Sequence, residues 1–253
     1  MSLPAARSDD DPTLTVEPKA RVFAALDTSD LTRAIALARS LSGLVGGMKV
    51  GKEFFTAQGP EGVRRAVGDL PLFLDLKFHD IPNTVAGAIR AASALRPTIV
   101  NVHASGGRAM MAAAAEAARD AAATVGTPAP LVIGVTVLTS LDDDDLAAVG
   151  QGGPMEAQVR RLAALTQESG LDGVVCSPRE IAVLRRDCGP DFRLVVPGVR
   201  PAYAERGDQK RVMTPAEALA AGADYLVIGR PITAAPDPAE AARRIAAELA
   251  DGA

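Results

Sequence analysis

Short runs of β-branched and other apolar residues alternate with alanine-rich stretches of helical periodicity along nearly the whole chain. Strands that alternate with helices imply parallel pairing through right-handed crossovers. About eight such units fit between residue 21 and the end of the chain at residue 253, which predicts a closed (β/α)8 TIM barrel of the α/β class. Strands are expected at residues 22–26, 46–50, 72–77, 99–103, 131–137, 173–176, 193–197 and 225–228.

Two of the expected helices have well-marked starts. Ser177 and Thr214 each precede a proline, and a glutamate follows three residues after each hydroxyl residue. This pattern is typical of a capping box with proline in the first helical position. Helical periodicity is clearest at residues 31–41, 85–95, 108–123, 155–169 and 239–249.

The main alternative to a barrel is an open, doubly wound sheet. Such a sheet would be expected to carry a Gly-x-Gly-x-x-Gly motif after its first strand, and no such motif follows residues 22–26. No linker divides the chain, so residues 21–253 are expected to form a single domain. Residues 1–20 carry acids and prolines but no apolar stretch, which indicates a disordered or partly ordered tail rather than a signal peptide.

Composition narrows the range of partners. The net charge is −4, and the chain lacks the basic blocks that bind nucleic acid or anionic membranes. No apolar stretch is long enough to span a bilayer. The two cysteines, Cys176 and Cys188, fit neither a zinc pattern nor a disulfide framework, so we expect reduced thiols in a cytoplasmic protein. If the substrate is anionic, a few lysine or arginine side chains close to the binding site would have to attract it.

The third expected strand ends in charged residues. In a (β/α)8 barrel the chemistry takes place at the C-terminal ends of the strands. Asp75 and Lys77 lie two residues apart and should point to the same side, whereas Leu74, Leu76 and Phe78 should point towards the helices. Burying such charges is costly unless each is paired. A purely structural ion pair at the barrel mouth is therefore one interpretation.

A catalytic or binding site is the other interpretation, because more charged residues end the neighbouring strands. Asp27 and Lys49 follow the first and second strands and would extend the pair into an alternating array. Gly229 and Arg230 follow the eighth strand, where barrels of this kind commonly bind phosphate. Glycine lets a backbone N–H approach an anion and arginine offers a planar fork, although a tight turn with a surface arginine gives the same sequence.

The segment from Asp75 to Thr84, DLKFHDIPNT, resembles the signature of bacterial orotidine 5'-phosphate decarboxylases. The resemblance covers about residues 21–249, with similar segments in the expected order. The Asp-x-Lys-x-x-Asp core is shared with related phosphosugar barrels, whereas its extension through His79 to Thr84 is much more specific. The other similar segments are residues 25–27, 49–53, 101–107, 135–140, 170–176, 197–201, 207–209 and 227–231.

This resemblance implies a cofactor-free enzyme that converts orotidine 5'-phosphate to uridine 5'-phosphate and carbon dioxide, the last step of de novo UMP synthesis. It also implies a homodimer with its active sites at the subunit interface. Lys77 would protonate the pyrimidine carbon that loses carbon dioxide, and Asp75 would lie beside the substrate carboxylate. Asp80 would reach into the partner's site as a further catalytic residue, with Thr84 near it.

The resemblance also assigns the contacts to the rest of the substrate. Lys49 and Asp27 would hold the ribose hydroxyls, and Lys49 would complete the catalytic charge array. Thr139 would contact the pyrimidine ring. The phosphate would be bound by Arg200, Gln209, Gly229 and Arg230. The segment spanning residues 200–211 is expected to close over the substrate.

The chemistry explains why these residue types are needed. Loss of carbon dioxide leaves a carbanion whose orbital lies in the ring plane, so the charge cannot delocalise into the ring. No cofactor motif in the sequence offers an electron sink, and the stabilisation would therefore be electrostatic. A fixed Lys77 ammonium would stabilise this charge and then deliver the proton. Asp75 and Asp80 would keep the ammonium charged and oriented.

Two other functions remain open on the sequence alone. A magnesium-dependent decarboxylase of keto-sugar phosphates shares the Asp-x-Lys-x-x-Asp core, and His79 or His103 could then serve as a metal ligand. We favour hydrogen-bonding roles for both histidines and expect no metal. A non-catalytic phosphosugar-binding barrel would not need Lys77. The acidic run at residues 142–145 is interpreted as a solvated loop or helix start rather than a cation site.

Overall fold

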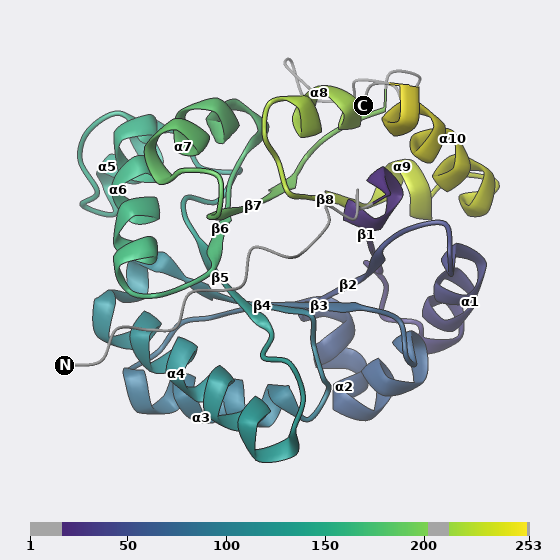
Figure 1. The fold of residues 1–253 in the computed structure, drawn as a ribbon, viewed down its shortest axis with the longest axis horizontal. Coiled ribbons are helices and arrows are strands. Elements are labelled where there is room, and N and C mark those ends of the chain that lie inside the picture. Colours follow the sequence, from purple (N-terminus) through teal and green to yellow (C-terminus); the bar gives the residue numbers. More distant parts are fainter. Residues whose placement is uncertain (1–16, 202–212, 252–253) are drawn as a thin grey trace, which may run out of the picture.

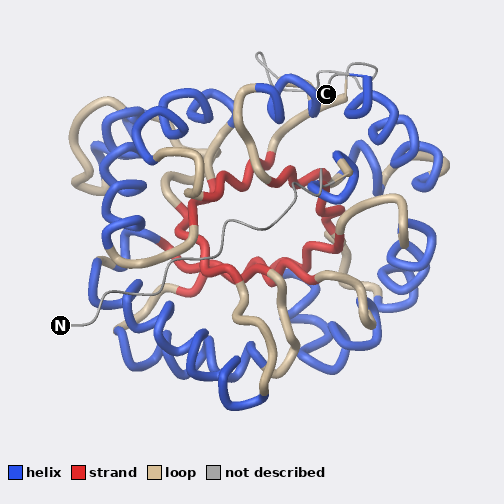
Figure 2. Tube along the Cα trace, in the orientation of Figure 1, coloured by secondary structure: helices blue, strands red, loops and turns tan. Residues whose placement is uncertain are grey.

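A computed structural model describes residues 17–201 and 213–251. Within these ranges eight parallel strands close into a barrel in chain order, and pairing of β8 with β1 completes the ring. Figure 2 shows the strands as an inner ring with the helices outside it. The predicted (β/α)8 barrel is thereby confirmed. The strands are β1 (Val22–Ala25), β2 (Gly47–Gly51), β3 (Leu72–Phe78), β4 (Ile99–His103), β5 (Leu131–Val135), β6 (Gly173–Val175), β7 (Arg193–Pro197) and β8 (Tyr225–Ile228).

The helices surround the barrel on all sides (Figure 1). The five predicted helices are confirmed to within three residues at each end. The longer helices are α1 (Leu31–Leu41), α2 (Lys52–Val67), α3 (Pro82–Ser93), α4 (Arg108–Val125), α6 (Met155–Glu168), α7 (Ile181–Cys188) and α10 (Pro238–Asp251). The short ones are α5 (Asp143–Ala148), α8 (Pro215–Ala220), α9 (Arg230–Thr233) and the 3-10 turns η1 (Pro18–Arg21), η2 (Ala104–Gly106) and η3 (Pro178–Glu180).

Both predicted capping boxes form. The Ser177 N–H donates to Glu180 Oε2 at 2.7 Å at the start of η3, which leads directly into α7. The Glu217 N–H donates to Thr214 Oγ1 at 3.2 Å at the start of α8. The acidic run also begins a helix, because Asp142 caps α5 through the N–H of Asp145.

Alternation along the strands sorts the apolar side chains into two layers. Asp75 and Phe73 of β3 face the barrel interior, whereas Leu74 and Leu76 pack against the helices, as predicted. Phe78 also packs against the helix layer. The interior cluster consists of Phe23, Ala25, Phe73, Ile99, Ile133, Val195 and Val227. The interior is thus a packed apolar plug, and polar side chains gather above it.

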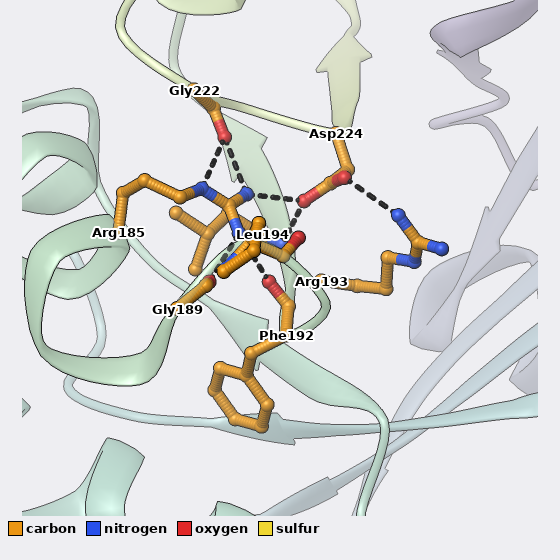
Figure 3. Close-up of polar contacts among 8 residues, drawn as sticks. Arg185, Gly189, Phe192, Arg193, Leu194, Gly222 and Asp224 are labelled. Atoms are coloured by element: carbon orange, nitrogen blue, oxygen red, sulfur yellow. Dashed lines mark hydrogen bonds and ion pairs between the residues drawn. The ribbon is translucent and has the colours of Figure 1, made fainter.

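The N-terminal rim of β7 and β8 holds a dense polar cluster (Figure 3). Arg185 of α7 donates to the carbonyl of Gly222 at 2.5 and 3.2 Å and to the Asp224 carboxylate at 2.6 Å. Asp224 also accepts from Arg193 at 3.0 Å and from the Leu194 N–H at 2.8 Å. Arg185 Nη1 further donates to the carbonyls of Gly189, Pro190 and Phe192. This cluster ties α7, β7 and the start of β8 together at the closed end of the barrel.

The expected N-terminal tail is only partly described. Residues 1–16 lie outside the described residues, and η1 begins at Pro18 and packs against α10. Part of the segment predicted as tail is therefore attached to the barrel. Among residues 17–201 and 213–251, no helix combines the length and apolar character that a membrane span requires.

Candidate active site

A cavity of about 340 Å³ opens at the C-terminal ends of the strands. It lies above the apolar plug, and its walls come from the ends of β1, β2 and β3 and from β5 through β8. The predicted site residues that line it are Asp27, Lys49, Asp75, Lys77, Thr139, Arg200, Gly229 and Arg230. Its apolar walls include Val135, Val137, Leu138, Pro197 and Val227. Such a cavity suits a small ligand with a flat apolar part and charged ends.

The predicted charge array is present at one side of this cavity. Lys49 Nζ lies 3.2 Å from Asp27 Oδ1 and 3.5 Å from Asp75 Oδ2. Lys77 Nζ lies 2.5 Å from Asp75 Oδ1. Opposite charges therefore alternate in the order Asp27, Lys49, Asp75, Lys77. A nearly buried Lys49 and a largely buried Asp75 stabilise each other's charge at the cavity wall.

Asp75 is the central carboxylate of the array. Burial on its own would raise the pKa of Asp75, but Lys49, Lys77 and the amide of Asn101 together hold it below the usual value. The carboxylate is therefore anionic at neutral pH. Lys49 and Lys77 both line the cavity, so the array presents two lysine nitrogens, each paired with Asp75, to a ligand.

The backbone at Lys77 departs from a regular strand. Leu74 pairs with Val100, and the next pairing joins Phe78 to Val102, so four residues advance on β3 while two advance on β4. Lys77 lies inside this bulge with a φ of +52°, a left-handed conformation that is rare outside glycine. Such a conformation costs about 1–3 kcal/mol and persists where the surroundings enforce it, often in functional sites.

Asn101 of β4 belongs to the array but was not predicted as a site residue. Its Nδ2 donates to Asp75 Oδ1 at 2.7 Å, and its Oδ1 accepts the Lys77 N–H at 2.8 Å. The sequence did carry a signal. Val100 and Val102 pack against the helix layer and Ile99 faces the interior, so an alternating strand places Asn101 inside, where a polar amide needs partners.

Two arginines line the same cavity from β7 and β8, and β7 lies across the barrel from β3. Arg200 follows β7, and Arg230 begins α9 directly after Gly229. Burial and the nearby Arg230 both lower the pKa of Arg200 from its usual value, and both side chains line the cavity. The Arg200 N–H donates to the Met213 carbonyl at 3.0 Å. A pair of neighbouring guanidinium groups suits a dianion such as phosphate.

Some predicted site residues are not brought to this cavity. Asp80 and Thr84 are exposed at the start of α3, and Asp80 Oδ1 accepts the Ile81 N–H at 2.6 Å. Neither residue lines the cavity of its own chain. Gln209, and with it most of the segment expected to close over the substrate, lies outside the described residues.

The two histidines lie beside the array and face each other. The rings of His79 and His103 have their centroids 5.4 Å apart. Burial, followed by the influence of His79 and two lysines, lowers the pKa of His103 to about 4, so this ring is neutral at pH 7. Neither ring hydrogen-bonds to a described residue, so the expected hydrogen-bonding roles are not supported. Among residues 17–201 and 213–251, no three His, Cys, Asp or Glu side chains gather as metal ligands.

Comparison with known proteins assigns the chain to a family. Residues 20–245 match the model of the "Orotidine 5'-phosphate decarboxylase / HUMPS family". The chain belongs to this family. The orotidine 5'-phosphate decarboxylase of Rhodospirillum rubrum is 61% identical over 230 residues, which are 90% of this chain and 93% of the relative. That of Moorella thermoacetica is 57% identical over 93% of this chain and 94% of the relative.

Solved structures agree with this assignment. The crystal structure of orotidine 5'-phosphate decarboxylase from Lactobacillus acidophilus matches with a TM-score of 0.78 and 36% identity. The match covers 90% of this chain and 98% of that one. An uncharacterized conserved protein from Geobacillus kaustophilus matches with a TM-score of 0.79 and 38% identity, over 90% of this chain and 99% of that one. The resemblance seen in the sequence motifs therefore extends over the whole barrel.

Proposed function

We propose that this protein decarboxylates orotidine 5'-phosphate to uridine 5'-phosphate and carbon dioxide without a cofactor, as the last step of UMP synthesis. The observation that carries the proposal is the position of Lys77. Its ammonium contacts Asp75 at the β3 wall of a cavity that Arg200 and Arg230 line from the side of β7 and β8. The pyrimidine would lie beside the lysine with the phosphate between the arginines.

The reaction then proceeds in two balanced events. The bond between the ring carbon and the carboxylate breaks, carbon dioxide leaves, and the electron pair remains on the ring carbon. Lys77 Nζ stabilises this negative charge and transfers a proton to the same carbon, and the neutral amine then takes up a proton from solvent. Asp75 holds the Lys77 ammonium in place. Asp75 and Lys49 also preserve the alternation of positive and negative groups in the array during the reaction. Thr139 contacts the ring, and Lys49 and Asp27 hold the ribose hydroxyls.

The phosphate does not react, but its binding energy contributes to catalysis. Arg200, Gly229 and Arg230 bind it, together with Gln209, which lies outside the described residues, and this binding helps to order the charged groups around the ring. Loss of the Arg230 guanidinium should therefore lower kcat/KM for the phosphorylated substrate and leave any activity on the bare nucleoside unchanged.

Asp80 acts in the site of a second copy of the chain. Its side chain and that of Thr84 are exposed beside Ile81, whose side chain is 67% exposed, so this corner of α3 presents both polar and apolar surface for a symmetric homodimer. In that dimer Asp80 would add a second carboxylate next to Lys77. We place the protein in the cytoplasm, where its two free cysteines would stay reduced.

Mixing two inactive chains tests the shared site. Lys77→Ala and Asp80→Ala chains, each inactive alone, should recover about a quarter of the parent activity when refolded or co-expressed together, because half the dimers are mixed and each has one intact site. No recovery would show that Asp80 does not act across an interface. Light scattering on the parent protein checks the dimer independently.

The alternative of a magnesium-dependent decarboxylase of keto-sugar phosphates is not favoured, because the relatives from Rhodospirillum rubrum and Moorella thermoacetica are both named orotidine 5'-phosphate decarboxylase. Loss of orotidine 5'-phosphate absorbance, followed with and without EDTA, separates the two. The proposal predicts turnover that EDTA does not change. Absence of turnover, together with magnesium-dependent release of carbon dioxide from a keto-sugar phosphate, would favour the rival.

A further inference from the structure

Asn101 is fully buried, and both ends of its amide contact catalytic groups of the proposed reaction. The amide nitrogen Nδ2 donates to Asp75 Oδ1 at 2.7 Å, and the amide oxygen Oδ1 accepts a hydrogen bond from the backbone N–H of Lys77 at 2.8 Å. A carboxylate can only accept and an N–H can only donate, so these two partners fix the orientation of the amide. One side chain thereby connects the two residues on which the chemistry depends.

The position of Asn101 in the barrel explains why this connection is needed. The bulge between Leu74 and Phe78 takes the N–H of Lys77 out of the ladder with β4. The Asn101 carbonyl pairs with that N–H and supports the left-handed backbone of Lys77. Without this acceptor the N–H would lose a partner in a half-buried position, and Lys77 would lose a restraint on the direction of its side chain.

We propose that Asn101 is a positioning residue for the decarboxylation. Its amide holds the Asp75 carboxylate and the Lys77 backbone in one fixed arrangement, so that the Lys77 ammonium is aimed at the reacting carbon. Asn101 does not line the cavity, so it acts through these two residues rather than on the substrate. This inference rests on the proposed function and adds a residue to it.

The residue type follows from the two contacts. Leucine has a similar volume but offers neither a donor nor an acceptor. Aspartate keeps an acceptor for the Lys77 N–H but replaces the donor to Asp75 with a second carboxylate oxygen. At neutral pH neither leucine nor an ionised aspartate satisfies both contacts, so Asn101→Leu and Asn101→Asp test the proposal from two directions.

Steady-state kinetics of Asn101→Leu with orotidine 5'-phosphate provide the first test. We expect kcat to fall on the order of a hundredfold, because small misplacements of a catalytic group have effects of this size. Binding of uridine 5'-phosphate, measured by calorimetry, should change by less than about threefold, since the cavity wall is intact. A kcat within threefold of the parent value would overturn the proposal.

Thr166→Val is the matched control for loss of a buried polar group. Thr166 is also fully buried, and its hydroxyl donates to the Leu162 carbonyl at 2.7 Å, away from the cavity. This variant should be less stable than the parent protein and keep its kcat. If its kcat falls as far as that of Asn101→Leu, buried polar contacts affect turnover in general and Asn101 has no positioning role.

Asn101→Asp keeps the shape of the side chain and decides the matter if Asn101→Leu does not fold. The new carboxyl group would lie against Asp75, whose carboxylate Lys49 and Lys77 contact, and His103 lies two residues further along the same strand. At neutral pH kcat should fall at least tenfold, because an ionised carboxylate repels Asp75. As the pH is lowered, the ratio of variant to parent kcat should rise, because a protonated carboxyl group can again donate to Asp75.

A flat ratio across the pH range, with kcat equal to that of the parent, would overturn the inference. The parent protein in the same assay separates this failure from failure of the proposed function. If the parent protein does not turn over orotidine 5'-phosphate, the function is wrong. If it does and both Asn101 variants match it, only the positioning role is wrong.

Discussion

The two ends of the barrel each hold a cluster of partly buried ion pairs, and the clusters differ in how many of their donors have an acceptor. At the N-terminal rim every N–H group of the Arg185 guanidinium has an acceptor, and both oxygens of Asp224 are occupied (Figure 3). At the C-terminal mouth Asp75 is similarly saturated, but among described residues Lys77 Nζ contacts Asp75 alone. An ammonium has three donors, so the mouth keeps donors directed at the cavity.

This difference indicates that the cluster at the N-terminal rim serves stability, whereas the cluster at the C-terminal mouth serves the reaction. A cluster whose donors and acceptors are all paired has no group left to bind a ligand. Its hydrogen bonds therefore contribute to the stability of the fold, by joining α7, β7 and β8. A cluster with remaining donors and a left-handed lysine stabilises the fold less and can respond to charge that develops on a ligand. Substitutions at the two ends should therefore affect different measurements.

Replacing Lys77 should have the largest effect. Lys77→Ala removes both the proton donor and the charge that stabilises the carbanion, so kcat should fall at least about 10³-fold. Asp75 keeps Lys49 as a partner at 3.5 Å, so thermal stability should change little. The kcat and the Tm of the Lys77→Ala variant, each compared with that of the parent protein, check these two expectations. A variant that unfolds but retains its specific activity would reverse the comparison.

Replacing Arg185 should do the opposite. Arg185→Met leaves Asp224 paired with Arg193 but removes the shared donor of four backbone carbonyls, so loss of this charged network should cost about 3–5 kcal/mol. For a chain of this size that corresponds to a fall in Tm of roughly 6–20 °C. The folded fraction should retain the parent kcat.

Arg186→Met is the control for this change. Arg186 is the next residue, but its side chain is 68% exposed and pairs with Asp187 at the surface, so its loss should cost less than about 1 kcal/mol. Equal melting temperatures for the Arg185 and Arg186 variants would show that the rim cluster does not stabilise the barrel.

Removing a phosphate arginine should have a smaller effect on activity than removing the lysine. Arg230→Ala should lower kcat/KM by about 10–100-fold, since a charge-assisted hydrogen bond contributes about 1.5–3 kcal/mol. Because Arg230 is exposed, the Tm of the Arg230→Ala variant should stay close to that of the parent protein. Kinetics with orotidine 5'-phosphate and with orotidine distinguish a phosphate contact from a general loss of activity. Equal losses for both substrates would argue against the contact.

His103 should give the smallest effect, and only in acid. Its folded pKa of about 4 lies below the ordinary value of 6.5, so between these values the unfolded chain binds a proton that the folded chain does not. Stability should therefore fall as the pH drops from 6.5 to 4, by at most about 1 kcal/mol because solvent screens a half-buried ring. Asn in place of His103 should flatten this slope in urea titrations at several pH values. An unchanged slope would contradict the assignment.

Much of the fold and part of the site follow from sequence alone. Repeated strand and helix periodicity predicts the barrel, and alternation along β3 predicts the contact between Asp75 and Lys77. The bulge in β3 was not predictable, because alternation assumes a regular ladder and nothing in the segment forces positive φ at a lysine. β5 was predicted too long for a similar reason. It ends at Val135, and the Thr136 hydroxyl bonds to the carbonyl of Val175 beyond the strand.

Two other predicted site residues are not brought to the cavity of their own chain. Asp80 and Thr84 were predicted from resemblance and lie exposed, so their predicted roles depend on the homodimer that we propose. Asn101 was missed because a lone amide in an apolar strand gives no motif, although its phase in the strand points inward. The role of such a residue depends on contacts with residues far away in the sequence, which a local sequence pattern does not reveal.

The central claim is that the Lys77 ammonium lies against the ring carbon that loses carbon dioxide. A crystal structure with an inhibitory uridine-phosphate analogue measures this directly. The account predicts Lys77 Nζ within about 3.5 Å of that carbon, with the phosphate at Arg200 and Arg230. A nitrogen more than about 5 Å from the ring, or a ligand bound the other way round with its phosphate at Lys77, would contradict it.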